Sequence, residues 1–307
     1  MRLAQAWYII PAPFTKRDAS QPIATTQMPA SSLIRKAERL LSEDRPVRFV
    51  LGRLLWRTGL CRLITYQMPD GYRMRFHPSA ISAALWQDRR FRTEDTDVIR
   101  KILRPGDTYV DVGANVGQLA IIAARQVGSA GLVLAIEPHP RTYRFLTENC
   151  ALNGLRIDTR NVAVGDREGT LPFTDLPLDD QNFVATGLPG GGRQVDVRVT
   201  TLDALVPDRP IRLMKVDVEG FELHALAGGG ATLARCSCVY IEESSKNLAR
   251  YGGTPEQLHA ALVHAGFTLL TADGRPLSPP EPGDQGSRNL LAVRTNDVEE
   301  IRARLGR

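Results

Sequence analysis

A glycine-containing segment between two acidic side chains is the best candidate for a ligand-binding site. Asp111 lies in an apolar run, Gly113, Asn115 and Gly117 follow it, and Glu137 lies 24 positions after Gly113 (137 − 113). Glycines let the backbone approach a ligand, and free N–H groups at the start of a following helix favour a negative group. A carboxylate such as Glu137 accepts several hydrogen bonds and suits the two hydroxyls of a ribose. Together these residues indicate a ligand that contains a nucleoside.

The segment departs from the dinucleotide fingerprint Gly-x-Gly-x-x-Gly, because Asn115 stands where the second glycine belongs. That glycine lets the backbone approach a pyrophosphate, so its absence favours a ligand with a ribose and an adenine but no diphosphate. Asp111 suits an ammonium group better than a phosphate. These features favour S-adenosyl-L-methionine. A nicotinamide-dependent oxidoreductase, a binding module without turnover and a plain strand-to-helix turn are the alternatives.

The elements that must position these residues are apolar strands that alternate with helices from about residue 94 onward. Such strands are typical of a parallel sheet covered on both faces, and residues 170–200 predict an inserted β-hairpin arm. The predicted fold class is therefore α/β, with a Rossmann-like, doubly wound, mostly parallel sheet, helices on both faces and a terminal antiparallel strand. We expect strands at 108–112, 132–136, 156–164, 213–218, 238–242, 267–271 and 290–294, and helices at 95–103, 118–127, 141–153, 221–226 (extending towards 233) and 255–265.

The chain before this alternation has a different character. Residues 1–30 are rich in Pro, Ser, Thr and Gln without a period, and we expect a poorly ordered tail. The N-terminal region of residues 31–93 is predicted to hold a short helix from Ser31, a helix from Pro46, a hairpin of residues 62–67 and 72–76, and a helix over 79–87. The ligand-binding domain is predicted to cover 94–296, followed by a helical tail over 297–307.

The positive charge of the chain is concentrated at its N-terminal end. Of 307 residues, 39 are Lys or Arg and 34 are Asp or Glu, a net charge of +5. Residues 1–58 hold ten basic and four acidic side chains, which leaves +6 there and −1 for the rest. A near-neutral main body lacks the positive face that binds phosphates, so nucleic acid is not the expected partner. Basic residues 31–57 could contact a membrane surface, an acidic protein or RNA, although a solvated helix is the simpler interpretation.

Other compositional features exclude several classes of protein. Four cysteines are too few and too scattered for a disulfide scaffold, and no apolar run has the length of a membrane span. His139, His224 and His264 form no spaced cluster of metal ligands, so no metal site is expected. We therefore expect a cytoplasmic protein.

Four segments carry a family resemblance: Val-Asp-Val-Gly-Ala-Asn-Val-Gly at 110–117, Ala-Ile-Glu-Pro at 135–138, Asn-Val-Ala-Val-Gly-Asp at 161–166 and Lys-Val-Asp-Val-Glu-Gly-Phe-Glu at 215–222. They resemble the FkbM-type methyltransferases, which have the class I S-adenosyl-L-methionine-dependent fold. The resemblance implies S-adenosyl-L-methionine as cofactor. It also implies a set of contacts: Asp111, Gly113, Asn115 and Gly117 at the methionine end, Glu137 and Pro138 at the ribose, Asn161, Val162 and Ala163 at the adenine, Asp217 beneath the methyl group, and Glu94 near the methionine end.

Acidic residues at the predicted strand ends are the candidates for catalysis. Methyl transfer to a hydroxyl needs a base within hydrogen-bond reach, and Asp217, Glu219 and Glu242 are the candidates, with helix capping as the alternative role of the first two. Glu222 is expected to cap a helix, and Lys215 to pair with a neighbouring carboxylate. The expected reaction is O-methylation of a hydroxylated small molecule such as a sugar or secondary metabolite. An N-methyltransferase of the same fold and an NAD(P)-dependent oxidoreductase are the alternatives.

Overall fold

The computed structural model describes residues 45–176, 182–185, 193–278 and 286–306, so the predicted tail over 1–30 and the predicted helix from Ser31 lie outside the described residues. The chain divides into two compact units, one that ends at Phe91 and one that begins at Arg92. No helix within the described ranges is long and apolar enough to cross a bilayer.

The first unit is small and contains the helix predicted from Pro46, the hairpin and the helix predicted over 79–87. An aromatic cluster supports it, in which the Trp86 ring stacks on Phe76 at a centroid distance of 5.2 Å and meets Tyr66 edge-on at 5.7 Å. A 3-10 helix takes the place of the first residues of the strand expected over 62–67. The elements are α3 (Pro46–Thr58), η2 (Leu60–Leu63), β1 (Thr65–Gln67), β2 (Arg73–Arg75) and α4 (Ala80–Gln87).

The second unit is built on a seven-stranded sheet of order β11-β12-β10-β9-β3-β4-β5. Pairings from β10 through β9, β3 and β4 to β5 are parallel, and β12 is antiparallel to both β10 and β11. The predicted α/β fold class with a terminal antiparallel strand is therefore confirmed. The strands are β3 (Thr108–Val112), β4 (Leu132–Ile136), β5 (Asp158–Arg160), β9 (Ile211–Val216), β10 (Cys236–Ser244), β11 (Phe267–Thr271) and β12 (Ser287–Arg294).

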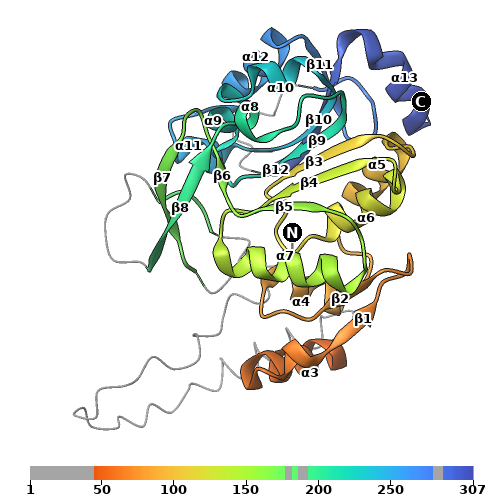
Figure 1. Cartoon of the computed structure of the whole chain (residues 1–307), viewed down its shortest axis with the longest axis vertical. Coiled ribbons are helices and arrows are strands. Elements are labelled where there is room, and N and C mark those ends of the chain that lie inside the picture. Colours follow the sequence, from red (N-terminus) through yellow and green to blue (C-terminus); the bar gives the residue numbers. More distant parts are fainter. Residues whose placement is uncertain (1–44, 177–181, 186–192, 279–285, 307) are drawn as a thin grey trace. The chain divides into compact units, whose positions relative to one another are not determined.

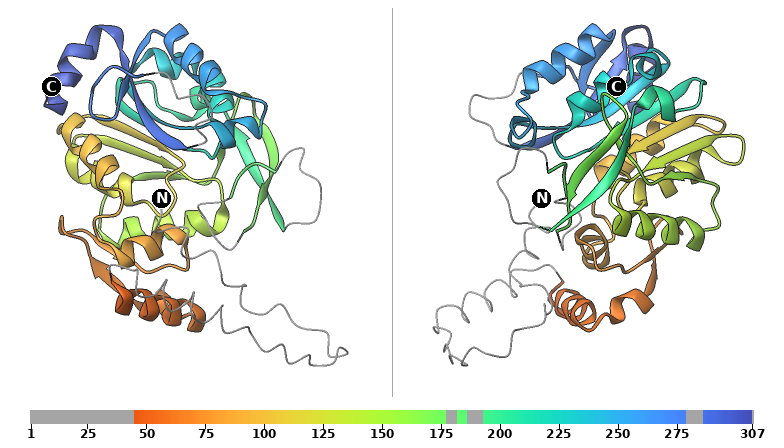
Figure 2. Two further views of the ribbon diagram at one scale, coloured as in Figure 1. Left: turned by 180° about the vertical axis from the view of Figure 1, so that it is seen from behind. Right: turned by 60° about the vertical axis from the view of Figure 1, so that its left-hand side comes forward.

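Helices cover both faces of this sheet (Figures 1 and 2). One face buries aliphatic side chains of β3, β4, β9 and β10 against α8–α12. The opposite face is covered by α5, which packs against α6 and α13. The helices are α5 (Thr93–Ile102), α6 (Gln118–Val127), α7 (Pro140–Leu152), α8 (Leu202–Leu205), α9 (Glu222–Ala227), α10 (Gly230–Ala234), α11 (Ser245–Ala249), α12 (Pro255–His264) and α13 (Val298–Leu305), with the 3-10 turn η4 (Thr295–Asp297) before α13.

Two predicted elements are each divided in the structure. The strand expected over 156–164 is β5 followed by β6 (Ala163–Val164), which leaves the main sheet and pairs with β8 (Gln194–Thr200). The helix expected to extend from 221 towards 233 is interrupted between α9 and α10. At this interruption the backbone passes close to the end of β6, since a Cβ on Gly228 would lie 2.1 Å from the carbonyl oxygen of Gly165.

The predicted inserted arm is confirmed as an antiparallel pair of β7 (Gly169–Thr174) and β8. Its apolar face packs on Phe221, which precedes α9, and the Tyr251 hydroxyl donates a hydrogen bond of 2.9 Å to the carbonyl of Val184. Close to this contact, Asp175 pairs with Arg141 of α7, at 3.0 Å. The arm is thus attached to two segments that follow the carboxyl ends of sheet strands.

Backbone hydrogen bonds join the carboxyl ends of β3, β4 and β9. The N–H groups of Gly113 and Ala114 both donate to the carbonyl of Ile136, and the N–H of Asp217 donates to the carbonyl of Val112. The chain runs outward from β3 through β4 to β5, and then returns to begin β9 on the other side of β3. Such a reversal of strand order is where open α/β sheets bind ligands.

Gly113→Ala tests how closely these strand ends approach one another. Gly113 has φ +85°, and a Cβ there would lie 1.9 Å from the carbonyl oxygen of Asp217. We expect the free energy of unfolding, measured with urea, to fall by about 3 kcal/mol or more, since the clash adds to the left-handed strain. Gly106 has φ +89°, and a Cβ there would meet no atom within 4 Å. It is the matched control and should lose only about 1 kcal/mol as Gly106→Ala. Equal losses would contradict the close approach.

Candidate active site

The turn between β3 and α6 requires the residue types found there. Gly113 and Gly117 both have φ +85°, and Asn115 has φ +50°. Asn115 stabilises its own left-handed conformation, because its Oδ1 accepts a hydrogen bond of 2.8 Å from the N–H of Val116. A Cβ on Gly117 would lie 2.5 Å from a methyl carbon of Leu146 in α7. The turn therefore lies close to both β9 and α7, and its N–H groups stay near the strand ends.

Glu137 points toward this turn. Its Oε2 accepts a hydrogen bond of 3.0 Å from the N–H of Asn115, and its Oε1 accepts one of 2.9 Å from the N–H of His139. Glu137 is buried. Each carboxylate oxygen can accept more than one hydrogen bond, which is the property that suits a pair of ribose hydroxyls. The ribose role of Glu137 stays a prediction.

Residues 161–163 follow β5 beside Glu137. The Asn161 amide donates hydrogen bonds of 2.9 Å and 2.8 Å to the carbonyls of Glu137 and Pro138, while Val162 and Ala163 are buried. The structure thus brings the predicted ribose and adenine residues together at one edge of the sheet. Their contacts with an adenine stay a prediction.

Polar side chains line one face of the sheet under α5. Asp111 of β3 is paired in register with Lys215 of β9, and Lys215 with Tyr240 of β10. Side chains alternate across a strand, so these residues face away from the aliphatic core that contains Val110 and Val112. An acidic and a basic residue inside buried strands therefore meet on the same face.

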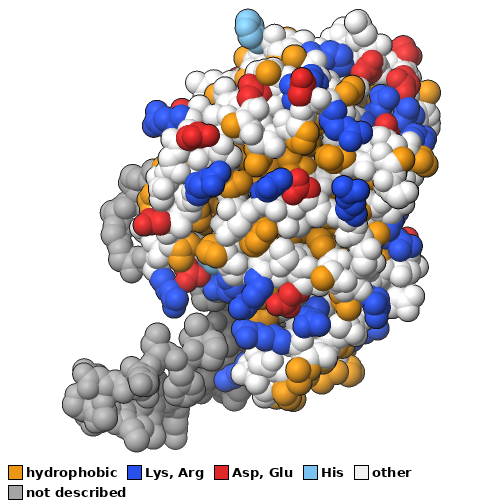
Figure 3. Space-filling view, viewed as in Figure 1, with side chains coloured by type: hydrophobic (Ala, Val, Ile, Leu, Met, Phe, Trp, Pro, Cys, Tyr) orange, Lys and Arg blue, Asp and Glu red, His pale blue; other side chains and the backbone are white. Residues whose placement is uncertain are grey.

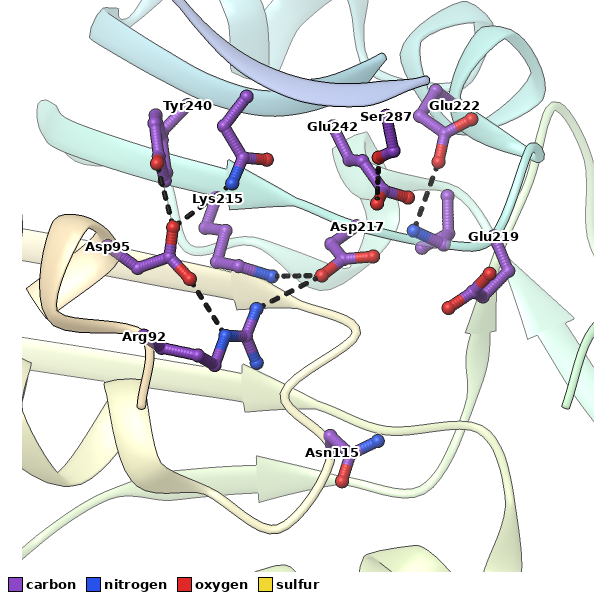
Figure 4. A network of polar contacts seen from close by, with 12 residues as sticks. Arg92, Asp95, Asn115, Lys215, Asp217, Glu219, Glu222, Tyr240, Glu242 and Ser287 are labelled. Carbon is purple, nitrogen blue, oxygen red and sulfur yellow. Dashed lines mark hydrogen bonds and ion pairs between the residues drawn. The ribbon is translucent and has the colours of Figure 1, made fainter. Parts of the chain in front are cut away.

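An ion-pair network joins this face to the start of α5 (Figure 4). Oδ2 of Asp217 accepts hydrogen bonds from Lys215 Nζ at 2.9 Å and from Arg92 Nη2 at 3.3 Å. The Arg92 Nε donates to Asp95 at 2.7 Å. Asp95 in turn accepts from the Tyr240 hydroxyl at 2.7 Å and from Asn289 Nδ2 at 3.0 Å. The predicted pairing of Lys215 with a carboxylate is confirmed.

Asp111 contributes a buried carboxylate to the same face. Only 1% of the residue is exposed, and neither carboxylate oxygen has a hydrogen-bond partner among the described residues. Burial raises the pKa of Asp111 to about 6, although Lys215 and Arg92 act in the opposite direction. With Arg92 and Lys215 counted against Asp95, Asp111 and Asp217, the cluster carries 2 − 3, or −1, when all five are ionised. A net negative cluster around such a carboxylate suits a cationic ligand.

Asp217 is held as an anion. Burial alone would raise its pKa, but the Lys215 ammonium and the Arg92 guanidinium outweigh burial and lower the pKa of this carboxyl below its usual value. Arg92 itself has φ +62°, an uncommon conformation for a residue other than glycine. A carboxylate with a lowered pKa is a weak base, so this position favours electrostatic binding over proton transfer.

The two glutamates after Asp217 each accept a local hydrogen bond with one oxygen, while the buried Oε2 of Glu222 has no hydrogen-bond partner among the described residues. Glu219, at φ +55°, accepts a hydrogen bond of 3.0 Å from Asn247 Nδ2. Oε1 of Glu222 accepts from the N–H groups of Val218 and Gly220, at 3.2 Å and 3.1 Å, so Glu222 holds the loop before α9 instead of capping the helix as predicted. Burial raises the pKa of Glu222 to about 7.

Glu242 and Glu243 lie on opposite faces of β10. Glu242 accepts a hydrogen bond from the Ser287 hydroxyl with one oxygen, whereas its buried Oε2 has no hydrogen-bond partner among the described residues. Burial, followed by the charge of Asp217, raises the pKa of Glu242 to about 7. Glu243 instead pairs with Arg288 at 2.8 Å and with His259. Glu242 is therefore the strand-end acid beside Asp217 that can accept a further hydrogen bond (Figure 4).

Several residues of the ion-pair network were not predicted from the sequence. Glu94 is predicted at the methionine end, but its side chain is exposed, and the next residue, Asp95, is the buried acid. Tyr240 was detectable, because it lies two positions before Glu242 in one strand and so shares its face. Arg92 had no comparable signal, since its contact with Asp217 spans 125 positions of the sequence. No group of three or more His, Cys, Asp or Glu residues in the described ranges is arranged to hold a metal ion.

The similarity to known proteins covers the part of the chain that contains this site. The family model of the methyltransferase FkbM domain matches residues 111–269. The hexuronic acid methyltransferase AglP of Haloferax volcanii is 28% identical over 192 residues, which are 61% of this chain and 77% of that protein. The 31-O-demethyl-FK506 methyltransferase FkbM of Streptomyces tacrolimicus is 27% identical over 158 residues, 41% of this chain and 60% of that protein.

The name of a third relative refers to a different class of molecule. The ribosomal RNA large subunit methyltransferase E of Sorangium cellulosum is 31% identical over 97 residues, 32% of this chain and 44% of that protein. The chain thus spans about three quarters of the length of AglP, three fifths of FkbM and less than half of this relative.

The two neighbouring acids of α5 can be separated by experiment. Asp95→Asn leaves the half-buried Arg92 with one carboxylate fewer, so we expect the free energy of unfolding to fall by about 2–4 kcal/mol. Affinity for S-adenosyl-L-methionine, measured by isothermal titration, should fall as well, because the position of Arg92 depends on Asp95. Glu94→Gln, the matched control on the same turn, should change stability by no more than about 0.5 kcal/mol and leave affinity unchanged. The reverse result would support the predicted role of Glu94.

Proposed function

The chain belongs to the FkbM methyltransferase family and is an S-adenosyl-L-methionine-dependent methyltransferase; on that premise we propose that it methylates a hydroxyl oxygen of a small molecule. The observation that carries this proposal is the Glu242 carboxylate at the carboxyl end of β10. One of its oxygens has no partner among the described residues, and its pKa is raised to about 7. A hydroxyl must lose its proton during transfer, and a base with a pKa near the working pH is the most effective acceptor of that proton.

The residues of the turn are proposed to hold the cofactor. When bound, S-adenosyl-L-methionine supplies a methyl group on a positively charged sulfur. The buried Asp111 carboxylate suits the ammonium group at the methionine end, close to Gly113, Asn115 and Gly117. Glu137 would accept the ribose hydroxyls, with Pro138 next to it. The adenine would be bordered by Asn161, Val162 and Ala163.

Asp217 and Glu242 are proposed to have different roles in methyl transfer. Asp217, held by Lys215 and Arg92, places a permanent negative charge near the site of transfer. The bound cofactor would supply the methyl group to the acceptor oxygen, and Glu242 would accept the proton that the hydroxyl loses. Because this reaction is an in-line displacement, alignment of the reactants supplies much of the acceleration. Glu219 lies next to this position and would help to orient the acceptor.

A small acceptor is favoured over a nucleic acid. Hexuronic acid and 31-O-demethyl-FK506 are the molecules named for two of the relatives, whereas the third is named for ribosomal RNA. The strand ends of this chain carry Asp217, Glu219 and Glu242, and an acidic edge repels phosphates. The arm, which is attached beside this edge through Tyr251 and Asp175, is proposed to border the acceptor. Cytoplasmic location stays a prediction from the sequence.

A labelled-cofactor screen tests the reaction class. The full chain is incubated with methyl-labelled S-adenosyl-L-methionine and panels of hydroxylated sugars, hydroxylated secondary metabolites, primary amines and RNA, and the labelled atom of each product is mapped. We expect label on an oxygen of a member of the first two panels. Label on nitrogen, or transfer to RNA alone, would overturn the proposal while leaving the family assignment intact.

The pH dependence of Glu242→Gln tests the base. Because Glu242 must be ionised to accept a proton and its pKa is raised to about 7, wild-type kcat/KM should rise about tenfold per pH unit below pH 7 and level off above it. Glu242→Gln should lower kcat by about 10²–10⁴-fold and remove this rise, with little change in cofactor affinity. Glu243→Gln, the matched control from the other face of β10, should keep the rise. An unchanged profile in Glu242→Gln would assign the base elsewhere.

A further inference from the structure

The first unit exposes an unusual set of aliphatic side chains. Within the described ranges, seven large hydrophobic residues are exposed, and six of them lie between positions 47 and 63. Val47 is 78% exposed and Leu63 is 81% exposed. Single exposed apolar residues are normal, but a cluster marks a binding surface. The six residues are Val47, Val50, Leu51, Leu54, Leu60 and Leu63.

The spacing of four of these residues places them on one face of α3. Val47, Val50, Leu51 and Leu54 follow an i, i+3, i+4, i+7 pattern, which forms a single stripe along a helix. The residues of α3 that are buried, Phe49 and Gly52, lie between them in sequence and so on the opposite side. One side of α3 therefore packs into the first unit, and an equally apolar side faces outward.

The segment that carries the outward face is strongly basic. Residues 45–63 contain five arginines and no acidic residue. Arg57 and Arg62 are exposed, and Arg48 and Arg53 are half-buried. Figure 3 shows hydrophobic side chains gathered over α3 at the lower end of the view, with Lys and Arg side chains beside them. We name as the α3 surface the six exposed apolar residues together with Arg45, Arg48, Arg53, Arg57 and Arg62.

We propose that the α3 surface binds an anionic phospholipid bilayer. A helix with an apolar stripe bordered by arginines lies in the plane of a membrane, with its aliphatic side chains among the acyl chains and its cations at the phosphates. The arginine stems reach the headgroups from the sides of the helix. Leu60 and Leu63 of η2 extend the apolar area beyond the end of α3. This interaction goes beyond methyl transfer and does not depend on the acceptor.

Other occupants fit the α3 surface less well. A second copy would bring five arginines against five, without an acidic residue of this segment to compensate. RNA would pair with the arginines but gains little from an aliphatic stripe, since bases stack on aromatic side chains and on arginine planes. Only an anionic bilayer offers apolar and negatively charged groups at the matching depths.

Vesicle co-sedimentation of the full chain tests the proposal. We expect binding to vesicles of phosphatidylcholine and phosphatidylglycerol, weak binding to phosphatidylcholine alone, and a decrease as salt is raised. Leu54→Ser with Leu63→Ser should weaken binding by at least about tenfold, because aliphatic carbons leave the bilayer. Arg57→Gln with Arg62→Gln should weaken it by at least about tenfold as well, because each cation near an anionic surface contributes about fivefold.

Matched controls come from the second unit. Val263→Ser removes the seventh exposed aliphatic residue, which is 56% exposed on α12, and Arg156→Gln with Arg167→Gln removes two exposed charges. Both controls should bind vesicles as the wild type does, and all variants should unfold at the wild-type temperature. Absence of vesicle binding by the wild type, equal binding to neutral and anionic vesicles, or equal losses in the controls would overturn the proposal. A dimer detected by light scattering and dissociated by Leu54→Ser with Leu63→Ser would also overturn it. So would binding of the chain to RNA that Arg57→Gln with Arg62→Gln weakens and Leu54→Ser with Leu63→Ser does not.

Discussion

The buried ammonium group of Lys215 is the constraint on which the site depends. Lys215 lies inside β9, with only 2% of its surface exposed, and an isolated charge there would cost several kcal/mol. Asp217 offsets this cost at the end of the same strand, Arg92 joins Asp217, and Asp95 joins Arg92. Each charge in this network is offset by a neighbouring charge of opposite sign. The start of α5 is thereby positioned against the carboxyl ends of the central strands.

Sheet topology determines which residues can share this environment. β12 runs antiparallel to β10, so its first residues lie at the edge where the parallel strands end. This arrangement places Ser287 beside Glu242 and Asn289 beside Asp95. Side-chain alternation sends Glu243 to the opposite face, where Arg288 and His259 neutralise it. Adjacent glutamates in one strand therefore have a raised pKa in one case and a lowered pKa in the other.

Local patterns were sufficient to predict most of the fold. The strands Thr108–Val112, Leu132–Ile136 and Phe267–Thr271 have the predicted bounds in the structure, because short apolar runs bounded by turns carry their own signal. Prediction was wrong at residues 156–164, since the division into β5 and β6 depends on pairing with β8, more than 30 residues later. Gly228, at the interruption after α9, likewise lies close to the distant carbonyl of Gly165.

The fold class, the glycine-containing turn and the acids at the strand ends can be predicted from the sequence, because each of these is encoded by neighbouring residues. Three other features depend on the folded arrangement: Asp95 rather than Glu94 is buried, Arg92 holds Asp217, and Glu242 keeps an oxygen without a partner among the described residues. The physical reason is that protonation and ion pairing depend on burial and on charges within a few ångströms. Those neighbours come from β3, β9, β10, β12 and α5, which no local pattern brings together.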